Sequence, residues 1–387
     1  LHLSVHSFPT RRSSDLDVAV FTHPAIRGYP ADIDRIVSGK GYGANSYIPT
    51  THPLVVVTGP GPGSGKLSTC LSQLYHEYQR GYEAGYAKFE TFPIWNLPLR
   101  HPVNVAYEAA TADIGDFNMI DPFHLESYGE TAVNYNRDVE SFPVLKTILE
   151  RITGTASIYQ SPTDMGVNRA AFGITDDTVV REAACQEVVR RFFRYQCEYA
   201  MGFTGKSTVE RAGLLMNRLA VGAKERPVVA AAREAAEEAR ESGKGHEGIF
   251  CGAALELDEN TIITGKNSPL MHAASSLVLN AIKTLAEIPE PIHLLAPNIL
   301  ESIGQYKSDV SNKKSVSLDV EETLIALSVS APTNPTAQMA LAQLRKLQGC
   351  EVHMTHIPTP GDEVGLRRLG VHLTTDPSFP SKSLYIS

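Results

Sequence analysis

The apolar residues of this chain change their spacing along the sequence, and the spacing predicts where strands and helices lie. Residues 54–57 form a short apolar run rich in β-branched side chains, which is typical of a buried strand. Beyond Ser64 the apolar positions recur at helical spacing, at Leu67, Leu71, Leu74 and Tyr78. Further strands are predicted at 18–21 and 86–90, and further helices at 31–37, 104–112 and 139–152.

Helical patterns dominate from Asp176 onward, and strands then return. Helices are predicted at 176–201, 206–221 and 227–242, the first with Asp176 or Asp177 as its N-cap. Residues 253–257 and 261–264 predict a hairpin. Helices are predicted at 269–286, 319–330 and 335–347, and strands at 351–355 and 371–374. The predicted fold class is α/β, with a P-loop-like α/β domain at 17–175, a helical subdomain at 176–245 and a C-terminal α/β domain at 246–387.

A glycine-rich turn separates the strand predicted at 54–57 from its helix. Strand, glycine turn and helix form the frame in which a P-loop binds phosphate through backbone N–H groups and a lysine, here Lys66. Leu67 stands where a magnesium-binding hydroxyl is usual, so Ser68 or Thr69 would take that role. The turn predicts ATP or GTP with Mg²⁺ as cofactor; the alternative is a rigid strand-to-helix turn. The predicted cofactor-binding residues are Gly59, Gly61, Gly63, Ser64, Gly65, Lys66, Ser68 and Thr69.

Polar and aromatic residues alternate most densely between 118 and 138. Asp121 and His124 are candidates for acid–base work, and Arg137 with Asp138 is a candidate clamp for a phosphate or carboxylate. Each has a structural alternative. Asp121 stands in a loop beside a proline, and Asp138 or Asn136 can cap the helix that follows. If these residues are catalytic, we expect them to lie beside the glycine turn, because ligand crevices form where strands of an α/β sheet end.

Composition narrows the possible partners. The 387 residues are 42% hydrophobic with a net charge of -8, which argues against nucleic acid or an anionic membrane as the main partner. No apolar run approaches the roughly 20 residues of a membrane span. Five scattered cysteines suit a reducing, cytoplasmic location. His353 and His356 face opposite sides of the predicted strand, so no metal site is predicted. Residues 1–16 have the character of a non-native leader.

Several long motifs resemble a bacterial family, domain-of-unknown-function family 1846. They are the glycine turn with 70–76 after it, together with 88–98, 134–138, 161–168 and 331–337. The resemblance runs from about residue 17 to the end and implies members that are longer at the N-terminus. It implies no reaction, so function is predicted from the residues.

Two functions fit these residues. The first is a nucleotide- or phosphate-dependent enzyme acting on a small molecule, with Asp121, His124, Arg137 and Asp138 as its catalytic groups. The second is a non-catalytic sensor or assembly module that binds a phosphorylated metabolite through the same turn. The sequence leaves the oligomeric state open, a homo-oligomer included.

Overall fold

The protein divides into two compact units. The computed structural model describes residues 19–60, 63–89, 93–166, 168–257, 260–309 and 316–380. Unit 1 comprises Leu1–Leu99 with Asn118–Gly173, and unit 2 comprises Arg100–Phe117 with Ile174–Ser387. The predicted α/β class is confirmed, since helices are combined with small sheets. The helices predicted as a separate subdomain at 176–245 belong to the same unit as the C-terminal sheet.

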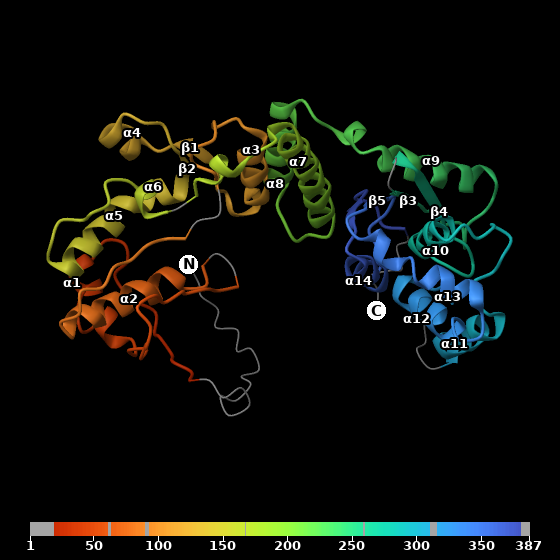
Figure 1. The fold of residues 1–387 in the computed structure, drawn as a ribbon, viewed down its shortest axis with the longest axis horizontal. Helices are drawn as coiled ribbons and strands as arrows, with labels where there is room; N and C mark the ends of the chain where they lie inside the picture. The colour runs from red at the N-terminus through yellow and green to blue at the C-terminus, as the bar shows by residue number, and fades with distance from the viewer. Residues whose placement is uncertain are drawn as a thin grey trace. The chain divides into compact units, whose positions relative to one another are not determined.

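Unit 1 is mainly helical and carries a small antiparallel sheet (Figure 1). Leu71 and Leu74 of α2 pack in one core with Phe142 and Leu149 of α5, which is why the apolar stripe of α2 faces inward. Its helices are α1 (Ile33–Ile36), α2 (Lys66–Gln79), α4 (Pro122–Tyr128), α5 (Asn136–Thr153) and α6 (Pro162–Met165), its 3₁₀ turns are η2 (Tyr42–Ala44) and η4 (Ala170–Gly173), and its strands are β1 (Asn118–Ile120) and β2 (Val133–Tyr135).

The strand predicted before the glycine turn is absent, so a P-loop-like unit is not confirmed. Residues 54–57 have no regular structure, and the side chains of Leu54 and Val56 are each 80% exposed. Residues 19–21 are also irregular, and within 86–89 only Lys88 forms a bridge, to Gly166. β-branched residues favour a strand only where a neighbouring strand pairs with them, and no described strand pairs with 54–57.

The first helical layer of unit 2 packs around Val105, Val188 and Leu215. The carboxylate of Asp176 accepts from the backbone N–H groups of Thr178 and Val179, which confirms one of the two predicted N-caps. The helices of this unit are α3 (Pro102–Ala110), α7 (Asp177–Ala200), α8 (Lys206–Leu219), α9 (Pro227–Glu241), α10 (Ala273–Leu285), α11 (Pro297–Asp309), α12 (Val320–Ser330), α13 (Pro335–Leu341) and α14 (Pro360–Leu369), with 3₁₀ turns η3 (Ala112–Ile114), η5 (Ala223–Glu225) and η7 (Leu344–Leu347).

A four-stranded sheet forms the centre of the C-terminal part. Its order is β4 (Ile262–Lys266), β3 (Gly252–Glu256), β5 (Glu351–Met354) and β6 (His372–Thr375). β3 runs antiparallel to β4 and β5, and β5 runs parallel to β6. The hairpin and both later strands predicted from the sequence are therefore confirmed.

Helices α9 and α10 cover opposite faces of this sheet (Figure 1). Ala253 and Leu255 join the core that contains α10, while Ala254 packs with Ala232 of α9. This alternation follows from the two-residue period of a strand. A Cβ on Gly252 would lie 2.1 Å from the carbonyl oxygen of Ala232, so glycine is required where α9 approaches β3.

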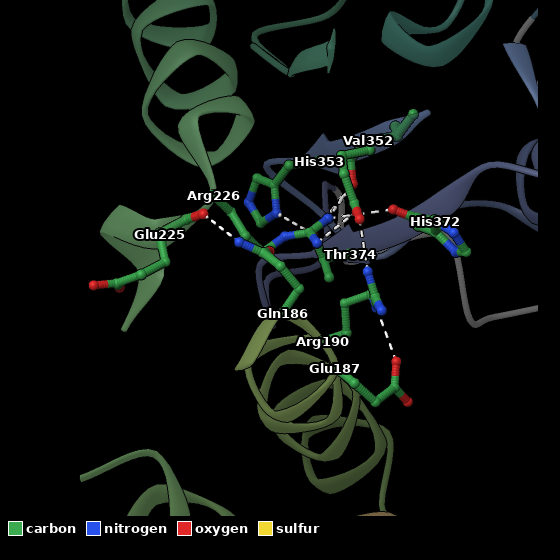
Figure 2. A network of polar contacts seen from close by, with 10 residues as sticks. Gln186, Glu187, Arg190, Glu225, Arg226, Val352, His353, His372 and Thr374 are labelled. Atoms are coloured by element: carbon green, nitrogen blue, oxygen red, sulfur yellow. Dashed lines mark hydrogen bonds and ion pairs between the residues drawn. The ribbon is translucent and has the colours of Figure 1, made fainter. Parts of the chain in front are cut away.

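A buried arginine connects the helical layer of unit 2 to the sheet (Figure 2). The side chain of Arg226, at the start of α9, is 0% exposed, and its Nη1 lies 2.6 Å from a carboxylate oxygen of Glu351. Its Nη2 donates to the carbonyl oxygens of Val352 and His372 and to the hydroxyl of Thr374. Arg190 of α7 donates to the other oxygen of Glu351 at 2.6 Å. One carboxylate thus ties α7 and α9 to β5.

Two further features concern the helices and the cysteines. None of the helices in the described part of the chain is long and apolar enough to cross a membrane. All five cysteines are free thiols.

Candidate functional site

The last residues of the glycine turn lead directly into α2. Gly63 and Gly65 have φ angles of 72° and 89°, in the left-handed region that favours glycine. Gly65 is the N-cap, and it makes no side-chain capping hydrogen bond. Nζ of Lys66 donates to Oγ of Ser64 at 3.3 Å. The first turn of α2 therefore follows a glycine, which has no side chain to cap its backbone N–H groups.

Among the remaining predicted turn residues, Gly59, Ser68 and Thr69 belong to the described part of the chain. Gly59 lies so close to Ser64 that a Cβ on it would be 2.5 Å from the Ser64 hydroxyl, and Gly61 lies outside the described residues. Ser68 is exposed and Thr69 is half-buried in the first turn of α2. A magnesium-binding role for either hydroxyl stays a prediction.

Asp121 is the N-cap of α4 and is fully buried. One carboxylate oxygen accepts from the N–H groups of Phe123 and His124, and the other accepts from the N–H and hydroxyl of Thr163. Both oxygens are therefore occupied by protein donors, which is the structural role that the sequence offered as the alternative.

His124 is likewise held by protein groups. Its Nδ1 lies 3.0 Å from Oγ of Ser161 and 3.7 Å from a carboxylate oxygen of Asp164. Ser161 and Asp164 form a capping box at the start of α6. The sequence prediction placed none of these α6 residues in the site, although a serine–proline pair followed by an acidic residue is a helix-start signal.

Asp138 and Arg137 lie in the first turn of α5, where Tyr135, rather than Asn136 or Asp138, is the N-cap. Asp138 forms an ion pair with Lys88, whose contribution the sequence analysis missed. Arg137 is exposed. The cluster predicted from the sequence thus gathers around α4, α6 and the start of α5.

Two adjoining hollows lie beside this cluster and share Trp95 and Val133. The smaller has a cavity volume of about 20 Å³, close to that of one water molecule, and is lined in part by Lys88, Asn134 and Asp138. The larger has a volume of about 500 Å³, which is in the range of small-molecule sites. Neither lining includes a described residue of the glycine turn.

Trp95 forms the wall between the hollows. Its carbonyl oxygen accepts from the N–H of Val133, which places the 93–99 segment beside β2. The guanidinium of Arg169 lies 4.6 Å from the centre of its ring, and His124 contacts the ring edge-to-face at 5.5 Å. Nε1 of Trp95 and Oδ1 of Asn96 are buried without a hydrogen-bond partner in the described part of the chain. Buried polar atoms usually have partners, so these two atoms are exceptions among the residues that line the larger hollow.

Comparison with known proteins identifies the family. The family model described as "Domain of unknown function DUF1846, N-terminal" matches residues 4–220, and "Domain of unknown function DUF1846, C-terminal" matches residues 224–385. The chain belongs to the DUF1846 family. The resemblance predicted from its motifs is therefore confirmed.

Curated relatives of this DUF1846 chain carry the name UPF0371 protein. One from Clostridium botulinum (strain Alaska E43 / Type E3) is 54% identical over 368 residues, which cover 95% of this chain and 73% of the relative. UPF0371 proteins of Clostridium tetani and Fusobacterium nucleatum are each 53% identical, with the same coverage of both chains. These names state no activity.

Proposed function

We propose that this DUF1846 protein is a nucleotide- or phosphate-dependent enzyme that acts on a small molecule. The observation that carries the proposal is the hollow of about 500 Å³, whose lining includes the charged side chains of Arg169 and Glu130. The same compact unit also contains the start of α2, where glycine is the N-cap. The hollow would take the small molecule, and the turn would take the phosphates, from ATP or GTP with Mg²⁺.

The physics of the helix start supports the phosphate part of the proposal. The backbone N–H groups of a helix start and the helix dipole favour an anion at this end. Lys66 would contact the outer phosphate, while Ser68 or Thr69 would help to hold Mg²⁺. A lysine in the first turn is mildly unfavourable without an anion, because it faces the positive end of the dipole.

The chemical step would depend on groups that retain access to a ligand. Asp121 is fully buried, and both of its carboxylate oxygens accept hydrogen bonds from protein groups. It would therefore stabilise the local fold of the site and would not contact the ligand. Asp138 with Lys88 lines the smaller hollow, and Arg137 is exposed beside it. Asp138, Lys88 and Arg137 are the proposed acid–base and phosphate-contacting groups. The ring of His124 contacts the ring of Trp95.

One observation favours the second function, a non-catalytic sensor or assembly module for a phosphorylated metabolite. Asp121, His124 and Asp138 all have protein partners, as expected of a cluster that stabilises a fold. Magnesium-dependent hydrolysis or phosphotransfer assays beside a binding titration separate the two functions, because a sensor would bind without turnover.

The substitution Lys66→Ala tests the phosphate site. Thermal melts of wild type, Lys66→Ala and the exposed-lysine control Lys40→Ala are compared with and without ATP–Mg²⁺, GTP–Mg²⁺ or pyrophosphate. A ligand stabilises only the state that it binds. We therefore expect Lys66→Ala to leave the melting temperature of the ligand-free protein nearly unchanged and to remove most of the ligand-induced shift. Lys40→Ala should keep the full shift.

Two results would overturn the phosphate site. One is the absence of any shift with all three ligands at millimolar concentration. The other is an equal shift in wild type and Lys66→Ala, which would mean that the lysine does not contact the ligand.

A further inference from the structure

The side chain of Arg169 is positioned by Trp95 and has no carboxylate partner among the described residues. Its guanidinium stacks on Trp95, and its side chain lines the larger hollow. The preceding Asn168 anchors this segment, because Nδ2 donates to the carbonyl oxygen of Pro93 at 3.4 Å and Oδ1 accepts from the N–H of Ala170 at 3.2 Å. No carboxylate of the described residues pairs with Arg169. A preorganised guanidinium with unpaired N–H groups is suited to bind a planar carboxylate through two hydrogen bonds.

Glu130 supplies the opposite charge in the same hollow. It follows Gly129, the residue that ends α4, and is exposed. Glu130 and Arg169 both line the hollow, yet they form no ion pair with each other or with other described residues. A hollow with one separated charge of each sign disfavours a doubly charged phosphate and favours a ligand that carries both charges.

The rest of the wall is mostly apolar. It includes the exposed ring of Phe172, which is 79% accessible to solvent. Removing such an apolar surface from water by contact with an apolar part of a ligand is favourable. The apolar lining residues are Leu97, Pro98, Leu99, Ile120, Val133 and Phe172.

We propose that this hollow binds a zwitterionic small molecule with an apolar body, the chemical class of the apolar α-amino acids. Arg169 binds its carboxylate, Glu130 binds its ammonium group, and the side chain packs on the apolar wall. The proposal rests on the proposed function for the location of the small-molecule site, and it names the substrate class there.

The protein carries a direct reporter for this binding. Its single tryptophan is Trp95, which lines the hollow. Tryptophan fluorescence is titrated with leucine, with isocaproate, which lacks the amino group, and with isopentylamine, which lacks the carboxylate. We expect leucine to change the fluorescence saturably and both analogues to bind at least roughly tenfold more weakly, because each loses one charge-assisted hydrogen bond.

Matched variants test which charged group of the ligand Arg169 and Glu130 each bind. Arg169→Gln should weaken leucine binding by roughly 10- to 100-fold and leave the affinity for isopentylamine unchanged. Glu130→Gln should weaken leucine and spare isocaproate. Arg151→Gln is the control, because Arg151 is an exposed arginine of the same unit that pairs with Asp34. It should bind leucine as wild type does.

The outcomes separate this proposal from the phosphate site. No saturable response to leucine, isocaproate binding as tightly as leucine, or leucine binding unaffected by Arg169→Gln would each overturn it. These results would leave the Lys66 test standing, since that test uses ATP, GTP or pyrophosphate and a different lysine. Conversely, leucine binding without any nucleotide-induced shift would support the zwitterion site and overturn the phosphate site.

Discussion

His356 is a buried histidine with an unsatisfied nitrogen. It follows β5, is 6% exposed, and its Nδ1 has no hydrogen-bond partner among the described residues. Burial lowers its pKa to about 4, partly offset by the charge of Asp362. His272 behaves in the opposite way: burial opposes its charge, but the hydrogen bond to Asp362 raises its pKa above the usual value. The two neighbours therefore respond differently to acid.

The lowered pKa of His356 predicts a loss of stability in mild acid. Between about pH 6.5 and 4 the unfolded chain binds a proton at this histidine that the folded protein excludes, so the free energy of unfolding falls as pH falls through this window. The full effect is about 3 kcal/mol. Urea unfolding across this range should show a shallower fall for His356→Gln than for wild type.

A matched control uses an exposed histidine of the same unit. His293→Gln should keep the wild-type slope, because His293 is exposed and the substitution leaves the buried His356 in place. Identical slopes in wild type and His356→Gln would show that this histidine is not responsible.

Close backbone contacts between helices and strands set the packing of unit 2. Gly252 of β3 meets the backbone of α9, and Gly265 of β4 meets that of α10, where a Cβ would lie 2.3 Å from the N atom of Leu277. Neither position has space for a methyl group. The sheet is therefore covered closely on both faces because glycine occupies both contact points.

The substitution Gly252→Ala should destabilise the protein. The added methyl group would push α9 away from β3, and overpacking of this kind costs roughly 1–3 kcal/mol. Gly304→Ala is the control, since Gly304 lies inside α11 and its nearest neighbour would be 3.8 Å from the new Cβ. That control should be neutral or stabilising by about 0.5–1 kcal/mol. Chemical denaturation measures both, and equal effects would contradict the close-contact explanation.

The long helices were predicted from the sequence more successfully than the short ones. The long helices of unit 2 have strong periodicity, and α7, α8 and α9 lie within a residue or two of their predicted bounds. By contrast, neither α4 nor α6 is among the helices predicted from the sequence. Both begin with a capping side chain followed by proline, so the start signal was present in the sequence. Their few residues are too short to show helical periodicity.

The Arg226 network crosses the boundary between the two family domains. Arg190 lies within the part matched by the N-terminal family model, whereas Arg226 and Glu351 lie within the part matched by the C-terminal model. Residues 174–220 accordingly belong to the same compact unit as the sheet. The sequence domains and the compact units are therefore different divisions of one chain.

The substitution Glu351→Ala should destabilise unit 2 strongly. It would leave Arg226 fully buried without a counter-charge, and breaking a buried pair in this way costs about 3–5 kcal/mol. The control Glu321→Ala removes a surface partner of Arg368, a pair expected to contribute about 0–1 kcal/mol. Equilibrium unfolding by urea compares the two. A loss no larger for Glu351→Ala than for Glu321→Ala would show that the network does not hold the sheet to α7 and α9.

Local signals in the sequence were enough for the α/β class, most helices and the strands of the C-terminal sheet. Periodicity and N-caps act over a few residues, so they can be read without knowing the fold. The family followed from the motifs for the same reason. The strand prediction at 54–57 was wrong because a strand needs a neighbouring strand to pair with, and only the fold supplies one.

The larger hollow depended on the tertiary structure alone. Trp95, Glu130 and Arg169 come from three separate segments, and no spacing in the sequence indicates that they line one cavity. The structure likewise decided that Asp121 caps a helix with both oxygens occupied, since a donor on Thr163 reaches it from 42 residues away. Capping and catalysis use the same side chains, and only the positions of distant donors distinguish them.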